Sequence, residues 1–375
     1  MVWLSRSRTV SAIGLDFGPR TVRAAQVACQ GDCWTLLRAS SWSKRDDEAG
    51  APVSEGFTRR VRRSVDQVPF QGRRVSGGLS VPEVEVHPLD IPDAGELQYE
   101  HKFGEAVRWE MQRFISYPVN QAAIDFWRIP RGAGTRTTAI GVAAKRSQVD
   151  ALSRFVDQLG WDCERVDATS CALARFGAVL RRRPGVDGQA AWGMLDIGHR
   201  MLRLVVCIGD SPVLVRNLGQ GGGAWTEAIA SGLGLSVEAA EIHKQDYGIG
   251  SAGADSGTEG DDVGDASRAS PEIGQMIGNI LRTDLAAVVG EIERSYEYVM
   301  RCYGERSAGA LMLAGGGAQL KHFKSYLKSK LGIEVLRVED IVSMADSPFQ
   351  VEGGVRQDLG SFAAAIGLAI EPEAA

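Results

Sequence analysis

The stretch IGLDFGPRTVRAA, residues 13–25, places a turn that contains Asp16 and Gly18 between two apolar runs. Protein kinases share the letters Asp-Phe-Gly, but they need a glycine loop, a lysine strand and a catalytic loop upstream. The few residues before Asp16 leave no room for these elements. The same layout recurs at MLDIGHRML, residues 194–202, again between two apolar runs. Two strand-turn-strand units 180 residues apart predict a duplicated architecture with two facing lobes.

Composition indicates a globular protein of more than one domain. The chain has 375 residues, of which 44% are hydrophobic, and a net charge of −5, which gives no indication of nucleic-acid binding. Its six scattered cysteines are typical of reduced thiols in a cytosolic protein, and its histidines lack the spacing of a zinc site. No signal peptide is visible, and the run FAAAIGLAI is too short to span a bilayer. We therefore expect only peripheral membrane association.

The first half of the chain contains an insertion. Three strands over 9–42, a helix over 59–68 and a strand near 74–82 precede it. The insertion, 81–166, is expected to form strand, helix, two strands, helix and strand. A capping box at Asp93–Glu96 opens its first helix, whose apolar face is expected to be Phe103, Val107, Met111 and Phe114.

The second half is expected to continue with alternating helices and strands. A glycine loop opens a helix over 219–234, and Ser236 caps the next one. The acidic, low-complexity segment 248–272 is predicted to be a disordered surface loop. One long helix over 273–304 follows, then a strand with glycines 315–317, a helix over 318–332, a strand, and a final alanine-rich helix.

The two Asp-x-Gly hairpins suit a polyphosphate. A tight turn after a strand aims backbone N–H groups at an anion, and glycine lets the backbone approach closely. Carboxylates hold Mg²⁺ through water, which assigns the metal to Asp16 and Asp196. A helix N-terminus also attracts anions. The predicted phosphate contacts are Asp16, Gly18, Arg20, Thr21, Asp196, Gly198, Gly221 and Gly222.

The order of these elements resembles that of the actin-like ATPase superfamily. The matching segments are the hairpin at Asp16–Thr21, a connecting helix DATSCALARF at 167–176, the hairpin at Asp196–Gly198, Gly221-Gly222, an A-E-x-x-K helix with Glu241 and Lys244, the loop Gly315–Gly317 and a second connecting helix GSFAAAIGLAI. The resemblance implies an α/β actin-like fold with two duplicated lobes around a nucleotide cleft. It also implies that Glu241, Lys244, Gly315, Gly316 and Gly317 contact the adenosine.

Within the superfamily the chain most resembles the PilM family of type IV pilus assembly proteins, relatives of the division protein FtsA. Residues 104–126, 166–176, 226–244 and 291–304 carry this likeness. It implies a cytoplasmic scaffold, peripheral at the inner membrane, that binds ATP with Mg²⁺ and the N-terminal peptide of a PilN-like membrane protein. Other pilus inner-membrane proteins and further copies of the chain are implied partners.

The resemblance also divides the chain into four subdomains. The first lobe core is 1–80 with 167–189 and 358–372, and 81–166 is an α+β insertion of the FtsA and PilM type. The second lobe core is 190–222 with 308–357, and its small subdomain is 223–307.

The phosphate loops depart from the PilM pattern. Pro19 and Arg20 stand where the first loop usually has hydroxyls, and His199 and Arg200 replace small residues in the second. In the third loop either the Gly-Gly pair is shifted to 222–223 or Gly223 replaces an aspartate, and the replacement is favoured because Thr226 then keeps the family spacing. Arg20 and Arg200 add positive charge that offsets these losses, or else the cleft is degenerate.

Three alternatives stay open. A type II secretion or competence scaffold with a degenerate cleft would share these features. An actin-fold small-molecule kinase needs a catalytic carboxylate at an acceptor pocket, which no motif supplies. An FtsA-like filament protein needs a basic amphipathic C-terminal helix, and the chain ends in LAIEPEAA. The sequence favours a nucleotide-binding scaffold with at most weak ATPase activity.

Overall fold

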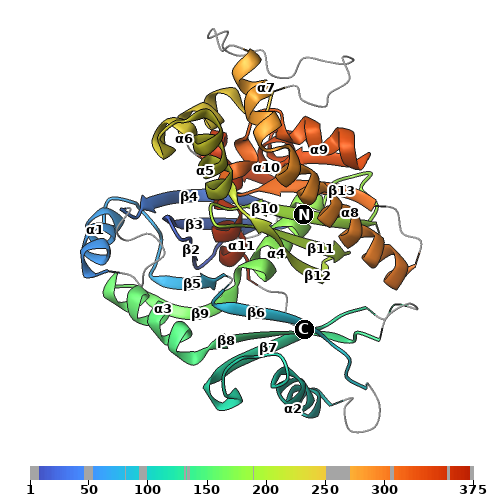
Figure 1. Ribbon diagram of the computed structural model, residues 1–375. Coiled ribbons are helices and arrows are strands. Elements are labelled where there is room, and N and C mark those ends of the chain that lie inside the picture. The colour runs from blue at the N-terminus through green and yellow to red at the C-terminus, as the bar shows by residue number, and fades with distance from the viewer. Residues whose placement is uncertain are drawn as a thin grey trace, which may run out of the picture.

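The computed structural model describes residues 8–371 apart from 46–53, 81, 93–98, 131, 133–135, 189, 251–270, 305–307 and 353–354. A seven-stranded sheet forms the first lobe, in the order β15-β4-β3-β2-β5-β9, with β1 paired to β3 (Figure 1). Its strands are β1 (Thr9–Val10), β2 (Ile13–Phe17), β3 (Thr21–Gln30), β4 (Cys33–Ser43), β5 (Arg74–Leu79), β9 (Asp162–Ala168) and β15 (Phe349–Val351).

Helices cover both faces of this sheet. Side chains alternate between the faces of a strand, so Ile13 and Leu15 of β2 pack with α1 (Glu55–Val65) and α3 (Arg146–Gln158). Gly14 between them meets the backbone of α11 on the opposite face. The alternation therefore fixes which helices lie on which side. The helices of this lobe are α1, α3, α4 (Thr169–Arg181) and α11 (Ala363–Ala369), the last preceded by a 3-10 segment at Val355–Phe362.

A five-stranded sheet in the order β12-β11-β10-β13-β14 forms the second lobe. Its strands are β10 (Ala191–Ile197), β11 (Met201–Ile208), β12 (Ser211–Gln220), β13 (Ala308–Ala314) and β14 (Glu334–Arg337). Its helices are α5 (Gly222–Leu233), α6 (Val237–Tyr247), α7 (Pro271–Ile280), α8 (Arg282–Tyr303), α9 (Phe323–Leu331) and α10 (Val338–Val342), with a 3-10 turn at Gly316–Gln319.

Helices α4 and α11 lie between the two sheets. One core cluster joins their side chains to Val27 and Leu36 of the first sheet and to Met194 and Val205 of the second. The two helices touch through glycine, because a Cβ on Gly367 of α11 would lie 1.9 Å from the carbonyl oxygen of Ala172 in α4. This crossing is therefore the junction of the lobes, at the centre of Figure 1.

The two predicted hairpins are equivalent. Phe17 pairs with Val22 and Ile197 pairs with Leu202, and one more backbone hydrogen bond inside each pair leaves a two-residue tip, 19–20 or 199–200. The Gly18 N–H donates to the Thr21 carbonyl at 3.0 Å, and the Gly198 N–H donates to the Met201 carbonyl at 3.1 Å. The duplication expected from the sequence is confirmed at the level of register.

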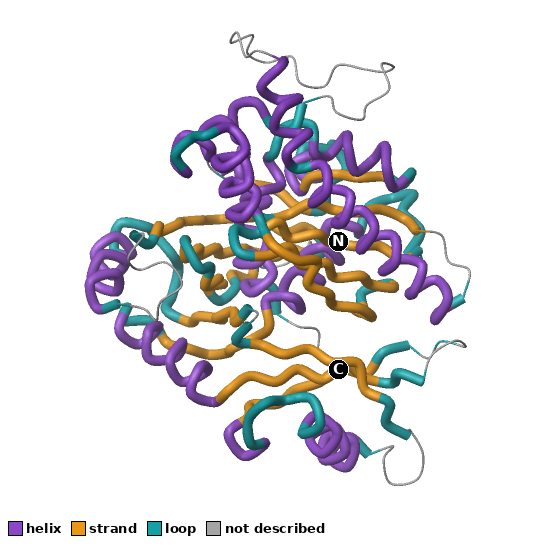
Figure 2. Tube along the Cα trace, viewed as in Figure 1, coloured by secondary structure: helices purple, strands orange, loops and turns teal. Residues whose placement is uncertain are grey.

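The insertion contains a separate three-stranded sheet, β6-β8-β7, below the larger sheets in Figure 2. Its elements are β6 (Val84–Leu89), α2 (Glu100–Met111), a 3-10 turn at Val119–Gln121, β7 (Ala122–Arg128) and β8 (Ala139–Lys145). Phe103, Val107 and Met111 are buried as expected. Phe114 was wrongly expected on that face: α2 ends at Met111, and Phe114, 42% exposed, stacks on His87. The capping box at Asp93–Glu96 lies outside the described residues.

Two strands belong to a different sheet from the one expected. The insertion was expected to end with a strand that runs to residue 166, but that strand, β9, pairs in parallel with β5 of the first lobe. Residues 349–351 were expected in the second lobe, but β15 pairs with β4 of the first. Strand β15 is short and β9 is partly polar. The strands that they pair with depend on long-range hydrogen bonds, which a local sequence pattern does not encode.

The insertion also touches the second lobe. The Trp127 indole N–H donates to the Pro212 carbonyl at 2.7 Å. Ile129 and Ile140 are buried in the core cluster of the second lobe. Gly132 lies so close to α8 that a Cβ there would be 2.1 Å from the Cys302 carbonyl oxygen. The insertion is therefore supported by both lobes.

Several helix boundaries differ from those expected. The helix expected over 59–68 spans Glu55–Val65 and is capped by Ser54. The single helix expected over 273–304 is two, because the buried Leu281 has ψ 0° between α7 and α8. The expected helix over 318–332 is a 3-10 turn followed by α9. Most of the loop predicted over 248–272 lies outside the described residues. No helix within the described ranges is both long and apolar enough to cross a bilayer.

Candidate functional site

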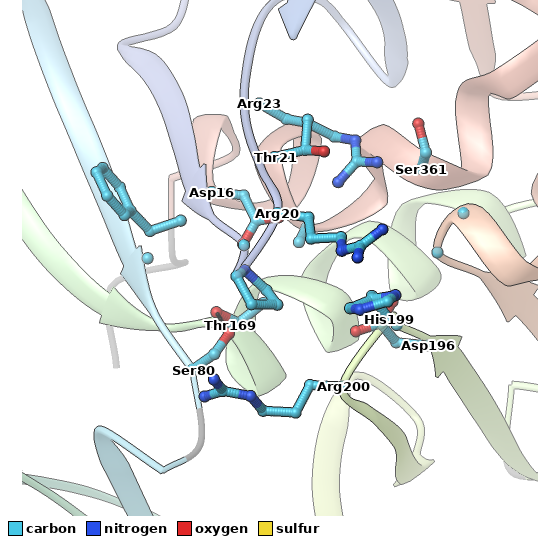
Figure 3. Close-up of a pocket in the computed structure, with 18 of the residues that line it drawn as sticks. Asp16, Arg20, Thr21, Arg23, Ser80, Thr169, Asp196, His199, Arg200 and Ser361 are labelled. Carbon is cyan, nitrogen blue, oxygen red and sulfur yellow. Dashed lines mark hydrogen bonds between the residues drawn. The ribbon is translucent and has the colours of Figure 1, made fainter. Parts of the chain in front are cut away.

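A cleft of about 1230 Å³ opens between the lobes. Both hairpins, α6 and the 315–317 loop line it, and Figure 3 shows Arg20 and His199 projecting into it. The structure brings together twelve of the thirteen predicted site residues: Asp16, Gly18, Arg20, Thr21, Asp196, Gly198, Gly222, Glu241, Lys244, Gly315, Gly316 and Gly317. Gly221 does not line the cleft.

Each predicted metal-binding aspartate faces an arginine on the next strand. Asp16 pairs with Arg23 across β2 and β3, and Asp196 pairs with Arg203 across β10 and β11. Arg203 Nη1 lies 3.7 Å from Asp196 Oδ2. The two sides of the cleft therefore have the same arrangement of an aspartate opposite an arginine, in addition to the same hairpin backbone.

Burial disfavours the charged form of both carboxyls. It raises the pKa of Asp16 to about 6, against the opposing effect of Arg23, and the nearby Asp196 raises it further. Burial likewise raises the pKa of Asp196, against Arg203 and Arg23. Among the described residues no three Asp, Glu, His or Cys side chains converge as a metal site. Carboxylates that are desolvated and that each face an arginine on the next strand do not fit the hydrated Mg²⁺ predicted from the sequence.

The 315–317 loop packs on the end of β10. Gly315 has φ 82°, and a Cβ there would lie 2.5 Å from Asp196 Oδ1. A Cβ on Gly317 would lie 2.3 Å from the Ile197 side chain. Gly316 has free space around it, because a Cβ there would have only Arg23 Nη2 of the other lobe nearby, at 3.8 Å. The loop thus offers bare backbone to the cleft at Gly316.

The N-terminus of α5 is not open to an anion. The N–H groups of Gly221, Gly222 and Gly223 donate to the carbonyls of Arg200, Gly198 and His199 at 3.0, 2.9 and 2.8 Å. A Cβ on Gly221 would lie 2.3 Å from the Gly198 carbonyl oxygen, so glycine lets the second hairpin dock there. Gly221 and Gly222 therefore make a structural contact with the second hairpin, and their predicted phosphate contact stays a prediction.

Lys244 is also held inside the protein. Its buried ammonium donates to Gly222 O at 2.9 Å, to Thr226 Oγ1 at 2.7 Å and to Glu241 Oε2 at 2.7 Å. Burial acts to raise the pKa of Glu241, but hydrogen bonds from Lys244 and Thr226 hold it below its usual range. All three protons of the ammonium are used, so Lys244 fixes α6 to the start of α5. Its predicted adenosine contact remains a prediction.

Two departures from the family pattern compensate each other. A Cβ on Gly223 would lie 2.5 Å from His199 Cε1, so the imidazole ring occupies the place of the missing side chain. Burial lowers the pKa of His199, and Arg20 lowers it further, so both favour the neutral ring. The large residue in the second loop therefore requires the glycine in the third.

We expect Gly223→Asp to lower the free energy of unfolding by about 1–3 kcal/mol, the usual cost of overpacking, because it displaces the ring. In a His199→Ala background the same change should be neutral or slightly stabilising, since an acidic residue suits the first turn of a helix. Urea unfolding of the four proteins gives the coupling energy. Equal effects of Gly223→Asp in both backgrounds would contradict the packing explanation.

Arg23 and Arg203 were not among the predicted site residues, yet both line the cleft. The signal was present in the sequence. Both hairpins read D-x-G-x-R-x-x-R, as DFGPRTVR at 16–23 and DIGHRMLR at 196–203. Gln319 and Asp358, which also line the cleft, belong to no repeated pattern and had no such signal.

Comparison with known proteins relates this geometry to two families. The family described as "Type IV pilus assembly protein PilM" matches residues 47–253, and "Cell division protein FtsA" matches residues 194–367. The structure of a "PilM-PilN type IV pilus biogenesis complex" is 23% identical over 96% of this chain and 99% of that one, with a TM-score of 0.71. Ethanolamine utilization protein EutJ from Carboxydothermus hydrogenoformans is 12% identical over 96% and 89%, with a TM-score of 0.50. The predicted actin-like ATPase fold is confirmed.

Proposed function

The chain belongs to the PilM family of type IV pilus assembly proteins, and from this premise we propose that it is a scaffold with two binding sites. One is the interlobe cleft, for a nucleotide such as ATP. The other, on the inserted subdomain, is for the N-terminal peptide of a PilN-like membrane protein. Through that partner the chain would lie at the cytoplasmic face of the inner membrane.

The equivalence of the two hairpins carries the nucleotide proposal. They meet across one cleft, and each tip bears an arginine at its second position, Arg20 or Arg200 (Figure 3). Guanidinium groups form paired hydrogen bonds to phosphate oxygens. Gly316, which lines the cleft without a side chain, would let a nucleoside approach the backbone. These residues would hold and orient the nucleotide between the lobes.

We propose binding rather than turnover. Hydrolysis needs a group that orients or deprotonates the attacking water. Asp16 and Asp196, the carboxylates between the hairpins, are each opposite an arginine on the next strand. His199 is packed on Gly223. The cleft therefore has binding groups and lacks an available base among these three. Phosphoryl transfer to a small acceptor would contradict this proposal and favour a kinase.

Exposed aromatic side chains support the peptide proposal. Trp109 of α2 is 71% exposed, and Phe114 just beyond it is 42% exposed. Aromatic side chains of this kind are enriched at protein interfaces. A similar structure is that of a PilM-PilN complex, which supports a PilN-like partner for this chain. We propose that Trp109 contacts the peptide.

Calorimetry with the N-terminal peptide of the PilN-like protein encoded beside the chain tests this role. We expect Trp109→Ala to weaken binding at least about tenfold, as a buried aromatic anchor does. Ile242→Ala, on the exposed face of α6 in the other lobe, is the matched control and should leave affinity unchanged. No binding by the unaltered chain would overturn the pilus scaffold.

A further inference from the structure

The cleft wall has buried hydrogen-bond donors without acceptors. Among the described residues that line it, Arg23 Nε, Arg203 Nη1 and Gln319 Nε2 are buried and make no hydrogen bond. Buried donors are almost always paired in folded proteins. Since all three orphan atoms are donors, the partner that satisfies them is an acceptor-rich ligand.

Arg203 is the most enclosed of the three. Arg203 is 4% exposed, it lies on β11, which pairs with β10 on one side and β12 on the other, and its Nη1 is 3.7 Å from Asp196 Oδ2. At that separation the pair attracts without forming a hydrogen bond. The charged guanidinium of Arg203 is therefore buried, and its Nη1 has no hydrogen-bond acceptor.

The charge balance in the cleft indicates an anion. Seven basic side chains and five acidic ones line it, although the chain as a whole carries −5. Basic groups come from both lobes, with Arg23 beside Gly316 and Arg203 beside Asp196. A ligand that bridges them must be long and multiply charged, as a chain of phosphates is.

The same arginines oppose a divalent cation. Mg²⁺ in proteins is held by carboxylates and several waters, and here each carboxylate has a guanidinium as its cross-strand neighbour. A second cation at either carboxylate would be repelled by the arginine that faces it. The repeated D-x-G-x-R-x-x-R pattern builds this opposition into both hairpins.

We propose that Arg23 and Arg203 bind the phosphates of the nucleotide directly and that binding needs no divalent cation. This inference rests on the proposed nucleotide site and deepens it. The two guanidinium groups take the place that Mg²⁺ has in the predicted arrangement, one from each lobe. The ligand class is a nucleoside diphosphate or triphosphate in its metal-free form.

Anisotropy of a fluorescent ATP analogue with the full chain tests this, in excess EDTA and in excess magnesium chloride. We expect the two Kd values to agree within about threefold. Inorganic tripolyphosphate should displace the analogue in EDTA and adenosine should not, because the phosphates are the anchor. Arg203→Gln should weaken binding in EDTA at least about tenfold.

Three variants make the result specific. Arg203→Lys keeps the charge beside Asp196 but loses the two-pronged geometry, and should bind between the unaltered chain and Arg203→Gln. Arg216→Gln on the neighbouring strand β12 changes an arginine outside the cleft and should bind normally. Thermal melts establish that each variant is folded. If Arg203→Gln is not, Arg203→Lys and Arg23→Gln carry the test.

The outcomes separate the two proposals. Binding that appears only with magnesium would overturn the metal-free site and leave the nucleotide scaffold standing. Binding that persists unchanged in the folded Arg203 and Arg23 variants would also overturn the metal-free site. No binding in either buffer would remove the nucleotide from the proposed function and this inference with it.

Discussion

Gly367→Ala is expected to lower the free energy of unfolding by about 3 kcal/mol or more, the upper end of overpacking costs. The new methyl group would lie 1.9 Å from the Ala172 carbonyl oxygen and 2.4 Å from its carbon. Those atoms are backbone atoms of α4, so no side-chain rotation relieves the contact. Either α11 moves away from α4 or the sheets it joins separate. Urea denaturation followed by circular dichroism measures the loss.

The same substitution at Gly290 is the matched control. Gly290 lies inside α8, and a Cβ there meets only the end of the flexible Arg294 side chain, at 3.2 Å. Alanine favours a helix interior over glycine, so Gly290→Ala should stabilise by up to about 1 kcal/mol. If the two variants shift stability in the same direction, the close crossing of α4 and α11 is not what holds the lobes together.

Asp16→Asn is expected to stabilise the chain at pH 7. Asp16 is 9% exposed, and burial raises its pKa from 3.8 to about 6. Ionising this carboxyl in the folded state then lowers the unfolding free energy by about 3 kcal/mol above pH 6, as an upper limit. The folded state holds the proton more tightly than the unfolded state does. This loss of stability therefore grows as the pH rises from about 4 to 6 and disappears below pH 4.

Thermal melts of both proteins from acid to neutral pH check this result. The stabilisation by Asp16→Asn should be largest at pH 7 and shrink as the pH falls toward 4. Asp346→Asn, which changes an exposed aspartate, should show no such trend. An Asp16→Asn variant that is less stable than the parent at pH 7 would mean that the carboxylate is stabilised by groups other than Arg23.

The hairpins could be predicted from the sequence because their information is local. Asp16, Gly18 and their counterparts Asp196 and Gly198 form a turn whose residues are adjacent in the chain, and the repeat shows that it occurs twice. The family resemblance then gave the order of the remaining elements. Fold and cleft position followed from these two sources.

What could not be predicted depends on segments that meet only in the folded chain. A run of glycines such as 221–223 indicates an exposed helix start, but the hairpin carbonyls at 198–200 already accept its N–H groups. Likewise, Lys244 reads as a surface partner of Glu241 until Thr226 and Gly222 are seen around its ammonium.

The bond from Trp127 to Pro212 has a consequence for motion. The insertion is covalently continuous with the first lobe and packs against it. Helices α4 and α11 join the first lobe to the second. The hydrogen bond from Trp127 joins the second lobe to the insertion. Each of the three parts therefore contacts the other two, so the lobes are not connected at a single hinge. A rotation of one lobe relative to the other must bend the three-stranded sheet or break the hydrogen bond between Trp127 and Pro212. A ligand between the lobes and a partner on the insertion therefore affect the same set of contacts.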